Sequence, residues 1–177
     1  KFGQNVMKEL ATYEIWLTAD DLAGLPKGIV DEAAQMAEAK GRKGEFLFTL
    51  AQPTYTAFIK YSERPDLREK FYRLYTGRNT KGEFSNVENM KRIAELRLSI
   101  AKLLGAKSHA DHSLQRTMAE NPANVYKLLD QLREAYKPAL EREIAELTEF
   151  ASETEGKPVT IRPWDYSYYS NKLKNAR

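Results

Sequence analysis

The chain has 177 residues, of which 42% are hydrophobic and 30% are charged, and its formal net charge is +3. This balance is typical of a folded globular protein rather than a disordered one. The small positive charge is spread along the sequence, which disfavours a nucleic-acid binder. The chain has no cysteine, so disulfides, thiolate metal sites and cysteine nucleophiles are excluded.

The sequence also bears on membrane and compartment. No stretch approaches the roughly 20 consecutive apolar residues that a membrane helix needs, so we expect no membrane partner. The absence of cysteine fits a reducing cytoplasm, where we place the protein, while a periplasmic or secreted location stays open. Residues 1–5 include neither an initiator Met nor an apolar signal segment, and we therefore expect a piece of a longer chain.

Helical periodicity begins at the N-terminus. Apolar residues at steps of three and four predict one amphipathic helix, and they are Phe2, Val6, Leu10, Tyr13 and Leu17. A second helix is expected from Pro26 to a stop at Gly41. The aromatic run Phe46–Leu50 then favours a short strand, with a single buried helical turn as the alternative.

Prolines and glycines mark the elements in the middle of the chain. Pro53 and Pro65 each suit the opening turn of a helix. The polar stretch 76–85 is predicted to be a flexible loop, because it is rich in glycine and turn residues. Asn86 can cap the next helix, which Gly105 closes.

The last third of the sequence predicts a long helix followed by a short one. The long helix starts at Asn121-Pro122 and runs to about Glu155, with an internal Pro138 that should kink it. Residues 159–161 are a candidate second strand, and Asp165 can cap the final helix. The predicted fold class is mainly α with minor short β-strands, over a single helical piece 1–177.

Both histidines lie in the stretch SHADHSL, residues 108–114. A tight zinc site takes roughly three or four ligands, and no third His or Cys exists to complete one, although carboxylates could contribute. Ser108 followed three residues later by Asp111 is typical of a capping box at a helix start. We therefore interpret His109 and His112 as part of a helix start, and we expect no metal ligand there.

Two further stretches are dense in aromatic residues. PWDYSYYSNKLK, residues 163–174, could line a groove for a peptide or nucleic acid, but the helical spacing of its rings favours packing in a core. EKFYRLYTGRNTKG, residues 69–82, is more typical of a solvated helix face than of a phosphate site. The sequence contains no His-Glu-x-x-His motif, no Gly-x-Ser-x-Gly motif and no phosphate-binding Gly-rich loop.

Several stretches resemble one family in order and spacing. They are FGQNV at 2–6, DDLAGLP at 20–26, FLFTLAQPTYTAFIKYSERPDLREKFYRLYTGR at 46–78, LRLSIAKLLGAKSHADHSLQRTMAENPANVYKLLDQL at 96–132 and PWDYSYYSNKLK at 163–174. The chain resembles the thimet oligopeptidase family of zinc metallopeptidases, which includes neurolysin, oligopeptidase A and bacterial dipeptidyl carboxypeptidase. The first and last stretches look most like dipeptidyl carboxypeptidase.

The resemblance implies a helical, two-lobed, neurolysin-like enzyme that cleaves oligopeptides in a channel between its lobes. Its zinc is held by a His-Glu-x-x-His helix and a more distal Glu, downstream of the stretches seen here. In the family, the segment that resembles His109 to His112 commonly has Tyr or another residue at its last position. We therefore expect no catalytic residue and no metal ligand in residues 1–177, and we leave substrate-binding residues unassigned.

The resulting hypothesis is a non-catalytic middle piece of a zinc-dependent, peptidyl-dipeptidase-like oligopeptidase. It would supply scaffold and part of the channel wall, with oligopeptide substrates and the remaining lobe of the same chain as partners. The alternative is a stand-alone helical module that binds a partner peptide along the surface formed by Trp164 to Tyr169. A His-Glu-x-x-His motif in the reading frame after Arg177 would discriminate the two.

Overall fold

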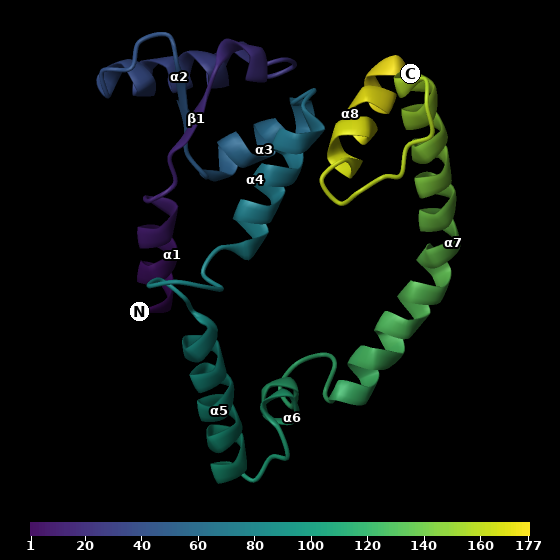
Figure 1. The fold of residues 1–177 in the computed structure, drawn as a ribbon. Coiled ribbons are helices and arrows are strands. Elements are labelled where there is room, and N and C mark those ends of the chain that lie inside the picture. Colours follow the sequence, from purple (N-terminus) through teal and green to yellow (C-terminus); the bar gives the residue numbers. More distant parts are fainter. The chain divides into compact units, whose positions relative to one another are not determined.

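The computed structural model describes residues 1–177 and contains eight α-helices, one 3-10 turn and two short strands (Figure 1). The helices are α1 (Phe2–Leu10), α2 (Lys27–Ala39), α3 (Gln52–Tyr61), α4 (Pro65–Gly77), α5 (Val87–Leu103), α6 (His109–Leu114), α7 (Pro122–Glu155) and α8 (Tyr166–Ala176). The strands are β1 (Ile15–Leu17) and β2 (Phe46–Phe48). The predicted mainly helical fold is confirmed. None of the helices combines the length and the apolar character needed to span a bilayer.

The chain divides into two compact units, and α7 contributes residues to both. Unit 1 comprises residues 1–85 and 146–177, and unit 2 comprises residues 86–145. Apart from Ala101, every buried hydrophobic residue belongs to unit 1. The role of residues 1–177 as a single piece of a larger enzyme stays a prediction.

The core of unit 1 forms around the two strands. β1 pairs with β2 in antiparallel register, with Ile15 opposite Phe48. The Phe48 ring meets Phe58 of α3 edge to face at 5.0 Å, and Phe58 stacks on Phe71 of α4 at 3.8 Å. Burial of these large rings supplies much of the hydrophobic stabilisation that holds α3 and α4 to the strands.

The strand predicted in Phe46–Leu50 is confirmed, whereas the predicted extent of the first helix and the candidate strand at 159–161 are wrong. The first helix ends at Leu10 rather than at Leu17, because Ile15–Leu17 pairs with the confirmed strand Phe46–Phe48. Residues 159–161 form no strand. The backbone N–H of Val159 instead donates to Ser152 Oγ at 3.0 Å, so this segment packs along α7.

The stretch predicted to be a flexible loop is shorter than expected. Its first two residues complete α4, which ends at Gly77. Asn79 then anchors the turn to α1, since its backbone N–H donates to Glu9 Oε2 at 2.5 Å and its Nδ2 donates to the Asn5 carbonyl at 3.2 Å. The flexibility of residues 76–85 stays a prediction.

The predicted helix starts agree closely with the structure, although Asn86 at the N-cap position of α5 makes no capping side-chain hydrogen bond. Pro53 and Pro65 lie in the first turns of α3 and α4. Asn121 caps α7, because its Oδ1 accepts a hydrogen bond from the Asn124 backbone N–H at 3.0 Å. Pro138 lies inside α7 as predicted. These boundaries depend on local chemistry, which explains the agreement.

Candidate functional site

A buried ion pair fixes the start of α8 in unit 1. The guanidinium of Arg68, on α4, donates from Nε and Nη2 to Asp165 Oδ1 at 3.2 and 2.7 Å. Its Nη1 donates to the carbonyl of Ser62, at the end of α3, at 2.8 Å. One arginine therefore connects α4, the end of α3 and the residue before α8.

Asp165 occupies the predicted N-cap position of α8 but does not use its carboxylate as a cap. Besides the contact of Oδ1 with Arg68, Asp165 Oδ2 accepts the backbone N–H of Arg162 at 3.3 Å. The predicted position is correct and the predicted role is wrong. The reason is the nearby buried guanidinium, because a charged partner competes strongly for a carboxylate.

The aromatic residues of 163–174 are mostly packed inward. Tyr168 and Tyr169 are each only 4% exposed, and the Arg68 guanidinium lies 4.1 Å from the centre of the Tyr168 ring. Trp164 packs against Tyr72 of α4. The interpretation of these rings as core residues is confirmed for Tyr168 and Tyr169, whereas Tyr166 is 42% exposed.

Tyr169 also connects α8 to α7. Its hydroxyl donates to Glu155 Oε1 at 3.1 Å. Burial, and then this hydrogen bond, raise the pKa of Tyr169 to about 12. The phenol is therefore neutral at ordinary pH, and its role is structural. Leu147 and Ala151 of α7 complete this second hydrophobic cluster.

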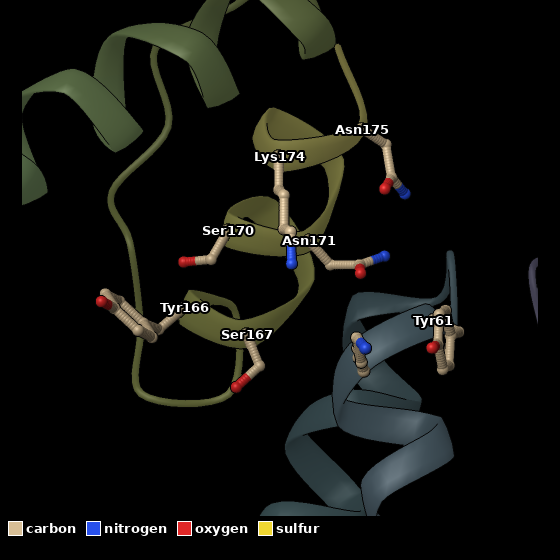
Figure 2. A pocket seen from close by; sticks show the side chains of 8 residues that line it. Tyr61, Tyr166, Ser167, Ser170, Asn171, Lys174 and Asn175 are labelled. Carbon is tan, nitrogen blue, oxygen red and sulfur yellow. The ribbon is translucent and has the colours of Figure 1, made fainter. Parts of the chain in front are cut away.

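A pocket of about 550 Å³ opens between α3 and α8 (Figure 2). Its α3 side is formed by Lys60 and Tyr61. The residues from α8 recur at helical spacing and form one face of the helix: Tyr166, Ser167, Ser170, Asn171, Lys174 and Asn175. Figure 2 shows the amides of Asn171 and Asn175 extending from α8 on the side where Tyr61 lies. The pocket is within the size range of small-molecule and peptide sites.

The chemistry of this α3–α8 pocket suits binding rather than catalysis. Its lining includes two lysines and no Asp, Glu, His or Cys. Neither Lys60 nor Lys174 forms an ion pair, and the Lys60 ammonium lies 4.9 Å from the centre of the Tyr61 ring. Asn and Ser side chains both donate and accept hydrogen bonds, as does a peptide backbone. The lining can therefore bind a polar chain or a carboxylate.

Sequence reasoning singled out residues 163–174 for their aromatic rings and missed their polar face. The signal was the spacing of Ser167, Ser170, Asn171 and Lys174 at steps of three and four. Lys60 and Tyr61 carried no signal, because they lie more than a hundred residues away in the sequence.

The histidine stretch forms the predicted helix start. Ser108 Oγ accepts the backbone N–H of Asp111 at 3.1 Å and donates to its carboxylate at 2.7 Å. His109 and His112 both lie on α6, and no three His, Cys, Asp or Glu residues of the chain are grouped so that they could hold a metal ion. The expectation that residues 1–177 bind no metal stays a prediction.

In the basic and aromatic stretch 69–82, both arginines make contacts within the fold. Arg73 pairs with Glu69 and lies 5.1 Å from the centre of the Trp164 ring. The Arg78 guanidinium lies 3.8 Å from the Tyr75 ring. These contacts favour the interpretation of a helix face over that of a phosphate site.

Comparisons with known proteins identify the family. The model of peptidase family M3 matches residues 58–177. Oligopeptidase A of Haemophilus influenzae and that of Escherichia coli are each 38% identical over 98% of this chain. The probable cytosolic oligopeptidase A of Arabidopsis thaliana is 31% identical over 100% of it. The chain belongs to peptidase family M3.

The match covers 26% of each of these three relatives, so the chain spans about a quarter of their length. The predicted resemblance to the thimet oligopeptidase and oligopeptidase A family is confirmed, as is its assignment to the hydrolases. The closer likeness to dipeptidyl carboxypeptidase stays a prediction, since these relatives are oligopeptidases A.

Proposed function

We propose that this chain is a non-catalytic part of a longer, zinc-dependent oligopeptidase. The observation that carries the proposal is the continuous similarity to oligopeptidase A, which extends over 98% of the chain at 38% identity. The chain supplies scaffold and a stretch of the wall that oligopeptide substrates contact. The name of the Arabidopsis relative, a probable cytosolic enzyme, supports a cytoplasmic location.

The zinc that the family implies does not fit the residues of this chain. A catalytic zinc needs about three protein ligands arranged around one point. His109 and His112 have no third His, Cys, Asp or Glu placed to join them. The ligands and the general base therefore belong to other parts of the longer protein, and no chemical step is assigned to residues 1–177.

The α3–α8 pocket is our candidate for the substrate-contacting wall. Its amide and hydroxyl groups match the donors and acceptors of an extended peptide. Lys174, which is exposed and outside any ion pair, can pair with a substrate carboxylate. The pocket binds and orients peptide, and it takes no part in proton transfer.

An exposed apolar face of α7 supports the presence of further protein. In unit 2 this face consists of Leu128, Leu129, Leu132, Tyr136 and Leu140, whose exposed fractions run from 42% to 66%. Their spacing of three and four residues places them on one side of the helix. Large exposed apolar patches usually mark an interface. We assign this face to contact with the remaining lobe of the longer oligopeptidase.

Activity tests the proposed function directly. The protein translated from the whole reading frame should cleave oligopeptides, a chelator should abolish cleavage and zinc should restore it. The 177-residue chain alone should show none with or without zinc. Chelator-sensitive cleavage by the 177-residue chain would overturn the assignment of the catalytic groups, and a reading frame without a His-Glu-x-x-His motif would overturn the peptidase role.

Two leucines of α7 test the interface separately. Leu129 is 52% exposed and Leu147 is 3% exposed. Leu147→Ala should lower the free energy of unfolding by about 2–5 kcal/mol in both proteins, because it leaves a cavity. Leu129→Ala should be nearly neutral in the 177-residue chain and clearly destabilising in the longer protein. Neutrality in both would show that this face stays exposed.

A further inference from the structure

A second cavity lies between α5 and α6, within unit 2, and has a volume of about 610 Å³. The α5–α6 groove is lined by Arg97, Ile100, Leu104, His109, His112, Ser113, Gln115 and Arg116. Its ionisable residues are two arginines and two histidines, with no carboxylate among them. Ala101 of α5 is fully buried, and α5 packs against α6.

The two guanidiniums of this groove have no partner within the protein. Neither Arg97 nor Arg116 forms an ion pair, and both are exposed. By contrast, Arg92, about one turn earlier on α5, pairs with Glu95 at 3.3 Å. The carboxylate of α6 is also occupied, since Asp111 accepts the hydroxyl of Ser108. The residues that line the groove therefore include two unpaired guanidiniums and no carboxylate.

We propose that the α5–α6 groove binds the phosphate group of a small molecule. A guanidinium presents a planar fork of N–H donors that matches phosphate oxygens, and two such forks occur here. Ser113 adds a hydroxyl, whose Oγ lies 3.3 Å from His109 Nε2. The two imidazoles act as hydrogen-bond donors to the ligand rather than as zinc ligands.

The groove has room for more than phosphate. Ile100 and Leu104 are 51% and 62% exposed and form an apolar floor beside the arginines. A phosphate with an apolar or aromatic body, such as a nucleoside phosphate, would cover this floor and gain the hydrophobic free energy of that contact. Inorganic phosphates offer the same charge without the body, so the two sources can be distinguished experimentally.

Calorimetric titration of the longer protein, in which unit 2 is covered, tests the proposal with four probes: ADP, inorganic pyrophosphate, adenosine and glutamate. ADP and pyrophosphate should bind with one-to-one stoichiometry, and adenosine and glutamate should bind at least about tenfold more weakly. Tighter binding of ADP than of pyrophosphate supports a nucleoside phosphate, and equal binding supports an inorganic source. Absence of binding by both phosphates, or equal binding of glutamate, overturns the proposal.

Matched arginine variants locate the site. Arg97→Gln and Arg116→Gln should each weaken the binding of ADP at least about tenfold, because each removes a charged fork. Arg142→Gln provides the control, since Arg142 of α7 is also exposed and outside any ion pair. The exposed positions leave the fold intact, which circular dichroism can verify. Equal weakening by all three variants would indicate nonspecific attraction and would overturn the site.

Discussion

Arg68 and Asp165 form the one ion pair of the chain in which both side chains are buried, at 2% and 9% exposure. Burying two charges is costly unless their remaining hydrogen bonds are satisfied, and here the Ser62 carbonyl and the Arg162 backbone N–H satisfy them. Removal of one charge would leave the other buried without compensation. The pair therefore positions α8, and with it the polar face that lines the α3–α8 pocket.

Asp165→Asn tests this role, because it preserves size and capping ability and removes only the charge. We expect a loss of roughly 3 kcal/mol or more in the free energy of unfolding, measured by urea denaturation. Glu69→Gln is the control. It breaks the exposed pair with Arg73 and should cost no more than about 1 kcal/mol. Equal small losses in both variants would argue against a positioning role for Asp165.

Two tyrosines make stability depend on pH in the alkaline range. Burial, with a hydrogen bond to a carboxylate, raises the pKa of Tyr13 and that of Tyr169 to about 12 each. The unfolded chain has an ordinary tyrosine pKa near 10, so above this pH it loses protons that the folded chain keeps. The stabilising contribution is complete below pH ~10 and is lost as the pH rises to ~12.

Ultraviolet titration of phenolate checks this expectation. The folded protein should contain late-titrating tyrosines, and Tyr169→Phe should remove one of them. The same variant should make the loss of stability above pH ~10 less steep. Glu155→Gln should lower the pKa of Tyr169 towards its usual value, because it removes the charged acceptor. An unchanged titration curve in both variants would show that Tyr169 is accessible to solvent.

At the scale of elements, the turn between the strand region and α2 depends on one glycine. Gly24 has a φ of 83°, and a Cβ atom there would lie 2.2 Å from the Tyr61 carbonyl oxygen. The backbone N–H of Glu63 donates to the Ala23 carbonyl at 3.0 Å. This close approach fixes the end of α3, where Tyr61 lines the α3–α8 pocket.

Gly24→Ala and Gly41→Ala separate steric conflict from backbone strain. Gly41 has a φ of 77° and no atom within 4 Å of an added Cβ. Gly41→Ala should therefore lower the free energy of unfolding by about 1–2 kcal/mol, because alanine disfavours the left-handed backbone conformation. Gly24→Ala should lower the free energy of unfolding by a further ~1–3 kcal/mol, because the added Cβ overpacks the contact with Tyr61. It should also change the environment of the Tyr61 side chain. Thermal melts that rank the two variants equally would contradict the crowded approach.

The helices and strands also show which features of the fold could be predicted from the sequence. Local chemistry predicted the first turns at Pro53 and Pro65 and the helix starts at Asn121-Pro122 and at Ser108. The partner of Phe46–Phe48 was missed, because Ile15–Leu17 continued a helical period and strand pairing depends on contacts about thirty residues apart. The α3–α8 pocket was missed for the same reason, since no periodicity within α8 predicts α3 as its neighbour.

At the scale of the whole molecule, apolar burial is distributed unevenly. Both hydrophobic clusters lie in unit 1, whereas the large apolar residues of α5 and most of those in the first part of α7 remain exposed. Hydrophobic burial is the dominant stabilising contribution in most folds. Unit 1 therefore has its own core, whereas unit 2 buries little apolar surface within the 177 residues, and under the proposed function its exposed face is covered by the rest of the longer protein.

Hydrogen exchange measured by mass spectrometry should reveal this difference within a single helix. The backbone amides of α7 in residues 146–155 pack with Tyr168 and Tyr169 and should exchange slowly. Those in residues 122–145 should exchange much faster in the 177-residue chain, because few buried contacts oppose their local opening. In the longer protein the second group should become protected as the apolar face of α7 is covered. Equal protection along the whole of α7 in the 177-residue chain would show that unit 2 is stable without further contacts.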